Sequence, residues 1–106
     1  MTLENLIRAL AAVPPDTKIR WGFHRPHSYR GSYFELAFEP CGPTTAGAML
    51  ACARDAVGKT FIGYKGGDFT MDENTRCWLS DYGECTWGEG VITVDMLARI
   101  LANEIP

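Results

Sequence analysis

The clearest chemical signal in this sequence is a stretch of basic side chains with no acidic residue among them. Residues 17–34 contain no Asp or Glu, yet they include Lys18, Arg20, Arg25 and Arg30. The 106-residue chain as a whole carries a formal net charge of −3. A local cationic patch on an acidic protein attracts a compact anion without drawing the whole molecule to nucleic acid. Arginine suits this role, because its planar guanidinium can hold phosphate or carboxylate through two hydrogen bonds.

Aromatic and histidine side chains lie between these cations. Tyr29 and Tyr33 flank Arg30, and flat rings of this kind can stack on a nucleotide base. We therefore predict a site for an anionic, nucleotide-like ligand formed by Arg25, His27, Tyr29, Arg30 and Tyr33. The alternative is a solvated loop whose arginines pair with carboxylates such as Glu35, Glu39 or Asp81.

A glycine pair, Gly66-Gly67, forms a second candidate anion site. Backbone N–H groups of adjacent glycines can turn toward one anion, and the preceding Tyr64 and Lys65 would add a ring and a charge. The segment lacks the spacing of a Walker motif and does not lead into a helix, so it is not a P-loop. The alternative is a hairpin turn in which the glycines adopt positive φ.

Three aromatic residues, Trp78, Tyr82 and Trp87, gather near the C-terminal end of the chain. Their rings suit a stacking wall for a ligand or an interface with a second copy of the protein. Trp78 and Tyr82 complete the predicted set of ligand-binding residues. Because so small a domain has little concave surface of its own, we predict a homo-oligomer with the site near or across the subunit interface.

Metal binding and catalysis have less support in the spacing of residues. His24 and His27 with Cys77 and Cys85 could supply tetrahedral zinc ligands, but neither pair has the spacing of a zinc knuckle. A nucleophilic Cys85 or Ser28 beside His27 lacks a carboxylate spaced to orient the histidine. The candidates for acid–base or magnesium chemistry are Asp68, Asp72, Glu73 and Asp81. Acidic side chains on turns more often serve turn geometry, so we predict no catalytic residue, metal or cofactor.

Composition and length predict one globular domain over residues 1–106. Hydrophobic residues make up 46% and charged residues 22% of the chain, which is the range of a protein that buries a core. No apolar run approaches the ~20 residues of a membrane-spanning helix, and the N-terminus lacks a signal-peptide pattern. The four cysteines form no C-x-x-C pair, so we expect reduced thiols in a soluble cytoplasmic protein with neither membrane nor nucleic-acid polymer as partner.

Hydrophobic periodicity predicts three helices and five strands. The helices are expected over 3–10 with Thr2 as N-cap, from Thr44 or Thr45 to Val57, and after Thr93 or Asp95. The strands are expected over 18–23, 33–39, 59–64, 68–71 and 75–82, with a polar connection over 24–32. Strands joined by short turns pair antiparallel. We therefore predict an α+β fold, a small antiparallel sheet with helices on one face in the order α-β-β-α-β-β-β-α.

Four blocks of the sequence resemble a family of small bacteriophage proteins. The blocks are SYRGSY at 28–33, GKTF at 58–61, GYKGGDFTM at 63–71 and DYG at 81–83. In order and spacing they are similar to the phage sponge proteins of the Thoeris anti-defence 1 type, and the similarity covers residues 28–83. Arg30 and the Gly66-Gly67 turn fall within matching blocks.

This resemblance implies a homo-oligomer that sequesters cyclic ADP-ribose isomers made by immune TIR enzymes, and in some members cyclic oligonucleotides, without cleaving them. We accordingly predict a phage-type binding protein that sequesters such a signal in the host cytoplasm and blocks anti-phage immunity. Two alternatives stay open. One is an inhibitor that binds a host defence protein directly through Trp78, Tyr82 and Trp87. The other is a small phosphohydrolase that uses His24, His27 and an acidic partner.

Overall fold

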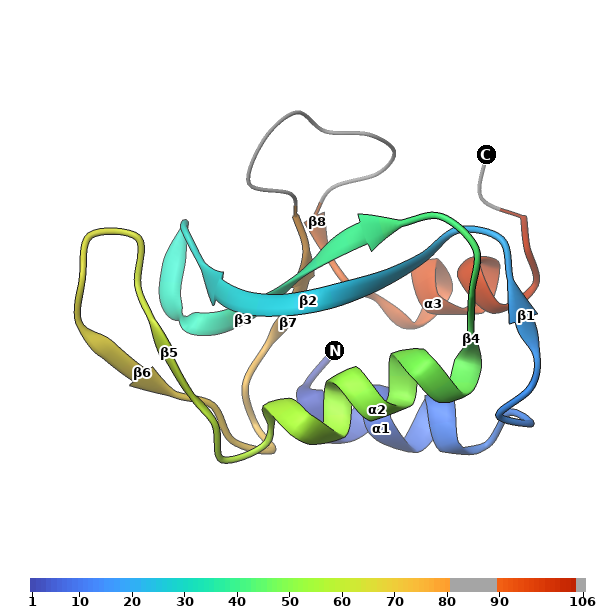
Figure 1. Cartoon of the computed structure of the whole chain (residues 1–106), viewed down its shortest axis with the longest axis horizontal. Coiled ribbons are helices and arrows are strands. Elements are labelled where there is room, and N and C mark those ends of the chain that lie inside the picture. Colours follow the sequence, from blue (N-terminus) through green and yellow to red (C-terminus); the bar gives the residue numbers. More distant parts are fainter. Residues whose placement is uncertain (81–89, 105–106) are drawn as a thin grey trace.

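A computed structural model describes residues 1–80 and 90–104 of the chain (Figure 1). Its three helices are α1 (Leu3–Ala11), α2 (Ala46–Ala56) and α3 (Val94–Leu101). The strands of the first half are β1 (Lys18–Ile19), β2 (Gly22–Tyr29), β3 (Ser32–Cys41) and β4 (Thr44–Thr45). Those of the second half are β5 (Thr60–Ile62), β6 (Asp68–Thr70), β7 (Cys77–Leu79) and β8 (Gly90–Val91). The predicted α+β class is confirmed, and the element order matches in outline.

The main sheet has the strand order β2-β3-β7-β8, and it mixes parallel and antiparallel pairs. Strands β2 and β3 form an antiparallel hairpin, whereas β3 and β7 run parallel. A parallel pair needs a long crossover, and here the chain passes through α2 and the β5–β6 hairpin before it returns. The prediction of a wholly antiparallel sheet is therefore corrected at this one pairing.

Residues 24–29, expected to be part of a polar connection, are the second half of strand β2. A β-bulge explains the missed pattern, because His24 pairs with Glu39 and His27 with Ala37. Two residues of β2, Arg25 and Pro26, thus lie opposite a single residue of β3, and Arg25 takes a φ of 45°. The bulge breaks the alternation along the strand, and proline is tolerated because β2 is at the sheet edge.

Each helix begins at a threonine whose hydroxyl accepts a backbone N–H from the first turn. The caps are Thr2, Thr45 and Thr93, and each of them is among the caps that the sequence predicts. Helix α2 ends one residue earlier than expected, so Val57 is its C-cap and is 39% exposed rather than buried. Gly58 follows with a φ of +76°, as expected for the residue past a helix end.

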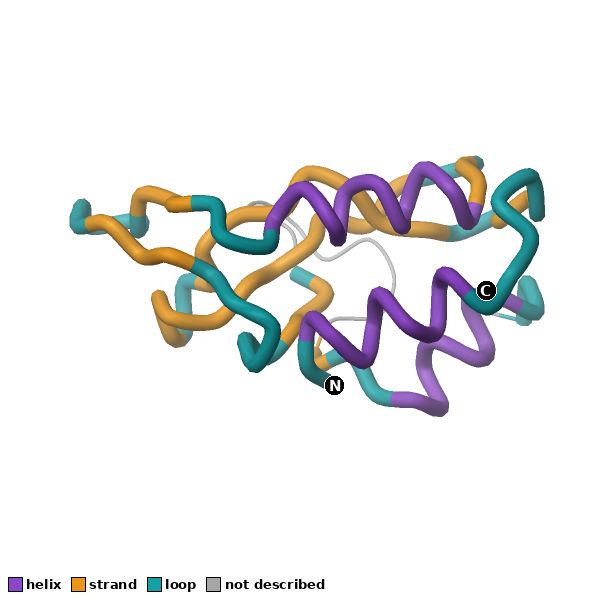
Figure 2. Tube along the Cα trace, turned by 90° about the horizontal axis from the view of Figure 1, so that it is seen from below, coloured by secondary structure: helices purple, strands orange, loops and turns teal. Residues whose placement is uncertain are grey.

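The core lies between the sheet and the helices. Figures 1 and 2 show α1 and α2 side by side along one side of the sheet, with α3 behind them. The largest fully buried side chains are Phe23, Phe38, Leu3, Leu6, Leu10, Ile19, Leu36, Met49, Met71, Leu79, Ile92 and Ile100. None of the helices in the described residues combines the length and the apolar character needed to cross a lipid bilayer.

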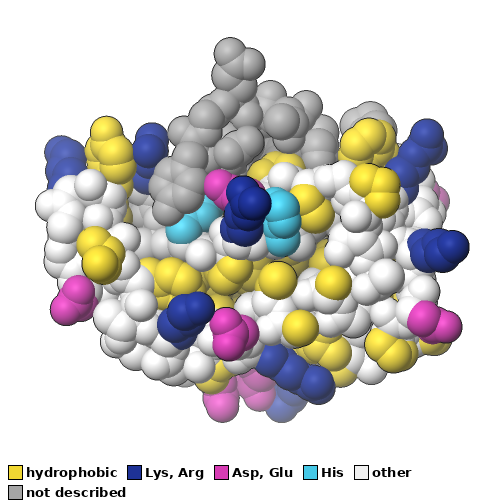
Figure 3. Space-filling model, in the orientation of Figure 1, with side chains coloured by type: hydrophobic (Ala, Val, Ile, Leu, Met, Phe, Trp, Pro, Cys, Tyr) yellow, Lys and Arg dark blue, Asp and Glu magenta, His cyan; other side chains and the backbone are white. Residues whose placement is uncertain are grey.

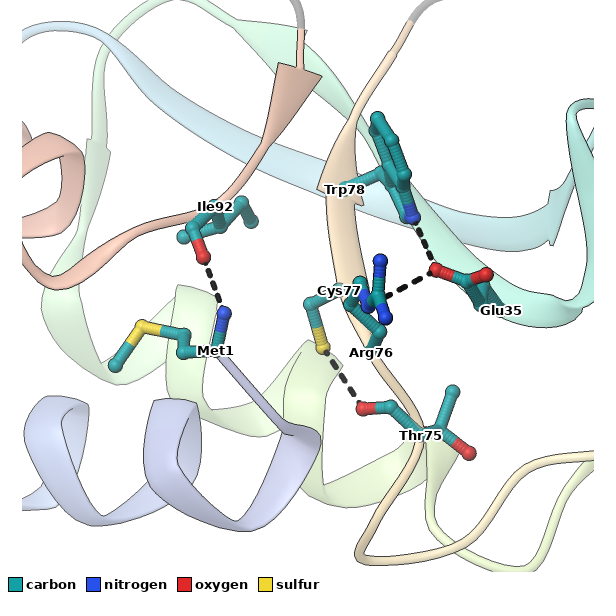
Figure 4. Close-up of polar contacts among 7 residues, drawn as sticks. All are labelled: Met1, Glu35, Thr75, Arg76, Cys77, Trp78 and Ile92. Carbon is teal, nitrogen blue, oxygen red and sulfur yellow. Dashed lines mark hydrogen bonds and ion pairs between the residues drawn. The ribbon is translucent and has the colours of Figure 1, made fainter.

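The first residues of the chain tie α1 to the sheet. The N–H of Cys77 donates to the carbonyl of Met1 at 3.0 Å, and the N–H of Leu3 donates to that of Thr75 at 2.8 Å. The Met1 amino group donates to the carbonyl of Ile92, which follows β8 (Figure 4). Met1 thereby bonds both to Cys77 of β7 and to Ile92 after β8, next to Trp78, which follows Cys77 in β7.

Candidate functional site

The four basic residues of the 17–34 stretch do not form one patch. Lys18 lies on β1, whereas Arg30 lies in the turn between β2 and β3, at the opposite end of the long axis (Figure 1). Strand β2 separates them with its eight residues, which span about 25 Å at roughly 3.3 Å each. Figure 3 shows the Lys and Arg side chains of one face spread over it rather than gathered. The predicted single cationic patch is corrected on this ground.

Arg25 and His27 belong to the bulge of β2, away from the β2–β3 turn. Arg25 Nη1 lies 4.0 Å from Glu39 Oε2, one of the pairings that the alternative interpretation expected. His27 is only 7% exposed, and its Nδ1 lies 3.3 Å from the carbonyl oxygen of Arg25. A ligand at the surface therefore meets Arg25 alone, and His27 has almost no area to offer it.

Two hairpin turns from distant parts of the sequence meet at the other end of β2. We call this region the two-hairpin end; it consists of the β2–β3 turn (residues 29–32) and the β5–β6 loop (residues 63–67). The Arg30 guanidinium carbon lies 4.1 Å from the centroid of the Tyr64 ring, which is a cation–π contact. Tyr64 is 64% exposed, and Lys65 is the next residue of the same exposed loop. The structure thus brings together Arg30, Tyr64 and Lys65, all three predicted ligand-binding residues.

Behind this contact, the rings of Tyr29 and Trp78 stack with centroids 4.2 Å apart and planes 9° apart. The Trp78 indole Nε1 donates to Glu35 Oε1 at 2.6 Å, and Arg76 Nε lies 3.4 Å from the same oxygen (Figure 4). A Cβ on Gly31 would come within 2.5 Å of the Tyr29 ring, so this position needs glycine. Tyr29 and Trp78 are therefore largely occupied with each other, and they support the turn rather than form an open stacking wall.

The hydrogen bond from Trp78 lowers the pKa of the Glu35 carboxyl below its usual range. Burial acts in the opposite direction, while a hydrogen bond from Ser32 and the nearby charge of Arg76 add to the lowering. Glu35 is thus held ionised as the acceptor that fixes both Trp78 and Arg76.

The glycine pair in the β5–β6 loop serves the turn. Gly66 and Gly67 have φ values of +93° and +89°, which favour glycine. The Gly66 N–H donates to the Gly63 carbonyl at 2.9 Å, and the Gly63 N–H donates to the Gly67 carbonyl at 3.0 Å. Because the Gly66 N–H is already used, the two glycines do not present a pair of donors to an anion. The hairpin-turn interpretation is confirmed.

Sequence reasoning missed the exposed apolar residues of this end. Phe34 shares the alternation of the buried Leu36, but it is 75% exposed and its ring meets Phe69 edge-on at 4.9 Å. The cause is an irregular register, because Ser28 pairs with Leu36 while Tyr29 pairs with Ser32. Residues 33–35 therefore loop out of the ladder, and no local signal in the sequence marks that loop.

Tyr33 and Ile62 complete the surroundings of the two-hairpin end. The Tyr33 ring lies 5.4 Å from that of Phe69, so it packs between the two hairpins as well as facing solvent. Ile62 is 74% exposed and directly precedes the loop. Tyr82, predicted as a ligand-binding residue, lies outside the described residues, as do Asp81, Cys85 and Trp87.

No group of three or more His, Cys, Asp or Glu side chains that could hold a metal ion occurs within residues 1–80 and 90–104. Burial raises the pKa of the Cys77 thiol to about 12, so this sulfur is a poor zinc ligand or nucleophile near neutral pH. It lies against the Thr75 carbonyl at 3.8 Å and fills space in the core (Figure 4).

Comparison with protein-family models, with curated proteins and with solved structures found no match to this chain.

Proposed function

We propose that this chain is a binding protein that sequesters a small, anionic, nucleotide-derived ligand at the two-hairpin end without cleaving it. The observation that supports the proposal is the Arg30 guanidinium held 4.1 Å above the exposed ring of Tyr64, at the junction of two turns. A nucleotide carries a flat base and a phosphate, and an exposed ring beside two cations offers a partner for each.

Each part of the two-hairpin end has a role in this proposal. The outer part of the Tyr64 ring stacks with the base, while Arg30 and Lys65 pair with the phosphate oxygens. Tyr29, stacked on Trp78, holds the turn that carries Arg30. Neither turn depends on the ligand for its shape, because the pairing of Tyr29 with Ser32 closes the first and the hydrogen bond from Gly66 to Gly63 closes the second.

The two-hairpin end projects from the domain, and one copy does not enclose a ligand there. We therefore propose that two or more copies of the chain close around the ligand, with Phe34 and Ile62 as apolar contacts between them. These two side chains are 75% and 74% exposed, which is typical of an interface. In this scheme the protein is a phage-type sponge that acts in the host cytoplasm against an immune nucleotide signal.

Isothermal titration calorimetry with cyclic ADP-ribose and a cyclic dinucleotide tests the proposal. We expect Arg30→Gln to weaken binding at least tenfold, and Arg8→Gln, which removes an exposed cation from α1, to leave it unchanged. Equal affinity of the two variants, or no binding of either nucleotide by the wild type, would overturn the site. Mass spectrometry of ligand released by denaturation must find it intact; a hydrolysed product would indicate a phosphohydrolase instead.

The exposure of Phe34 and Ile62 also favours a second candidate, an inhibitor that docks on a host defence protein through the same end. Trp78, which the sequence predicts as a contact of such an inhibitor, is engaged with Tyr29 and Glu35 and contributes little free surface. A pulldown from host lysate with wild type and with Ile62→Ser distinguishes the candidates. A host protein retained only by the wild type, with no bound nucleotide, would replace the sponge by the inhibitor.

A further inference from the structure

The opposite end of the molecule has a hollow of about 480 Å³ beside strand β1. We call it the β1 hollow; its lining includes Lys18, Ile19, Arg20, Pro43, Thr44 and Asn103. Strand β1 pairs with β4 in the register Lys18 to Thr45 and Ile19 to Thr44, so two short strands form one wall. Among the residues that the structure describes, none that lines this hollow carries a carboxylate.

Two cations line the β1 hollow. Lys18 lies on β1 and Arg20 lies in the bend that follows it, one on each side of the buried Ile19 in the sequence. Within the part of the chain that the structure describes, neither has a carboxylate oxygen within 4.0 Å, whereas Arg8, Arg25, Lys59 and Arg76 each have one. Arg20 instead lies near the ring of Trp21, with its guanidinium carbon 5.8 Å from the centroid.

Asn103 fixes the backbone that carries these cations. Its Oδ1 accepts a hydrogen bond from the Arg20 N–H at 2.7 Å, and its Nδ2 donates to the Lys18 carbonyl at 3.2 Å. The residue takes a φ of +58° just after α3, a conformation that asparagine tolerates better than most residues. The wall of the hollow is thus held by β4 on one side and by Asn103 on the other.

We infer that the β1 hollow is a second binding site, separate from the two-hairpin end, for a small organic anion with an apolar body. The Lys18 ammonium and the Arg20 guanidinium pair with its carboxylate or phosphomonoester head. Pro43 and the Thr44 methyl group contact the apolar body, as in typical ligand sites that combine apolar lining with a few polar anchors. Both parts are needed, because unpaired cations at an open surface would hold any anion equally weakly.

An NMR titration of the labelled protein with phenyl phosphate, with benzoate and with neutral benzyl alcohol tests the inference. For at least one of the two anions we expect chemical-shift changes at Ile19, Thr44 and Asn103. Benzyl alcohol is expected to bind at least tenfold more weakly than that anion. Shift changes confined to the two-hairpin end, or equal affinity for the neutral probe, would overturn the inference.

A matched pair of double variants tests the role of the cations. Lys18→Gln/Arg20→Gln is expected to weaken binding of the anion at least tenfold. Arg8→Gln/Arg54→Gln makes the same change in net charge at exposed helix positions and is expected to weaken binding less than twofold. Equal weakening by both pairs would reduce the effect to net charge and reject the site. The amide spectrum of each variant reports its fold, so a loss of binding cannot be confused with unfolding. This outcome is independent of the proposed function, because Arg30 and Tyr64 are unchanged in every variant.

Discussion

The two ends of β2 use their cations in opposite ways. At the two-hairpin end Arg30 lies on Tyr64, and outside it Arg76 lies beside Glu35, so each guanidinium has an internal partner. At the β1 hollow, Lys18 and Arg20 line a concave surface to which no residue within 1–80 and 90–104 contributes a carboxylate. The first end projects from the domain and is rich in aromatic contacts, whereas the second is a hollow whose lining combines two cations and polar side chains with Ile19 and Pro43.

This difference shows that closeness in sequence is a poor guide to closeness in space when a long strand intervenes. All four cations of the 17–34 stretch lie within thirteen residues of one another, yet β2 separates Lys18 and Arg20 at one end from Arg30 at the other and holds Arg25 in its middle. What matters for each cation is the partner that tertiary structure supplies. Stability measurements can test whether the contacts of each end are as different as the geometry indicates.

The largest effect is expected from Trp78→Ala at the two-hairpin end. The variant removes the stack on Tyr29 and the hydrogen bond to Glu35, and it leaves a cavity beside β7. We expect a loss of about 3 kcal/mol in the free energy of unfolding, in the range for truncation of a large aromatic residue. Urea denaturation followed by circular dichroism measures it.

Phe34→Ala is the control for Trp78, because it truncates an aromatic residue of the same region that is 75% exposed. Its expected cost is below about 1 kcal/mol. If the two truncations cost the same, Trp78 is not the internal support of the turn, and the contrast between supporting and exposed rings fails.

At the β1 hollow, the largest expected effect is that of Asn103→Ala. The change removes the hydrogen bonds to Lys18 and Arg20 and places alanine at a φ of +58°. Two exposed hydrogen bonds and one strained residue together predict a loss of about 2 kcal/mol. Asn103→Gly loses the same hydrogen bonds without the strain and is expected to cost about 1 kcal/mol. Equal costs in thermal unfolding would mean that φ at this position carries no strain.

Gly31→Ala returns to the two-hairpin end and tests its packing. The new Cβ would lie 2.5 Å from the Tyr29 ring, so the ring must move off Trp78. Overpacking of this kind predicts a loss of about 1–2 kcal/mol. Gly42→Ala is the matched control, since its Cβ would meet nothing within 4 Å and the expected change is below about 0.5 kcal/mol. A neutral Gly31→Ala would show that the stack is not held from this side.

The elements that the sequence predicted best are those with a local cause. The stripe of Leu3, Leu6 and Leu10 with a threonine cap sufficed for α1, and the glycine pair sufficed for the β5–β6 loop. In each case, the chemistry that sets the element lies within about ten residues of it. Tertiary context adds only the partner that covers the apolar face.

The failures have non-local causes. The sequence predicts a polar connection from His24 onward where β2 continues, because a bulge interrupts the alternation of the strand, and the bulge is visible only against the partner strand β3. The β3–β7 pairing depends on a crossover through α2, and no property of the 75–82 segment reveals a parallel neighbour. For the same reason the sequence does not predict the contact of Arg30 with Tyr64, thirty-four residues later, although it predicts each residue separately as ligand-binding.

The smallest effect is a pH dependence at Glu35. Its carboxyl pKa is lowered in the folded protein, first by the Trp78 hydrogen bond, so its contribution to stability is present above the pKa of the unfolded chain. That contribution disappears as the pH falls through the lowered pKa and the carboxylate becomes protonated. Trp78→Phe removes the hydrogen bond while keeping an aromatic ring against Tyr29.

We therefore expect the free energies of unfolding of wild type and Trp78→Phe to differ by about 0.5–1 kcal/mol more at pH 7 than at pH 2. This increment is the contribution of one hydrogen bond. NMR titration of the Glu35 carboxyl carbon should show its pKa rising in the variant. The control repeats the comparison of Trp78 with Phe in a Glu35→Gln background. Glutamine cannot titrate, so the difference between the two proteins should no longer depend on pH. A difference in the free energy of unfolding between wild type and variant that stays constant with pH would mean that the indole contributes through stacking alone. Arg76 and Trp78 would then not be coupled through the Glu35 carboxylate.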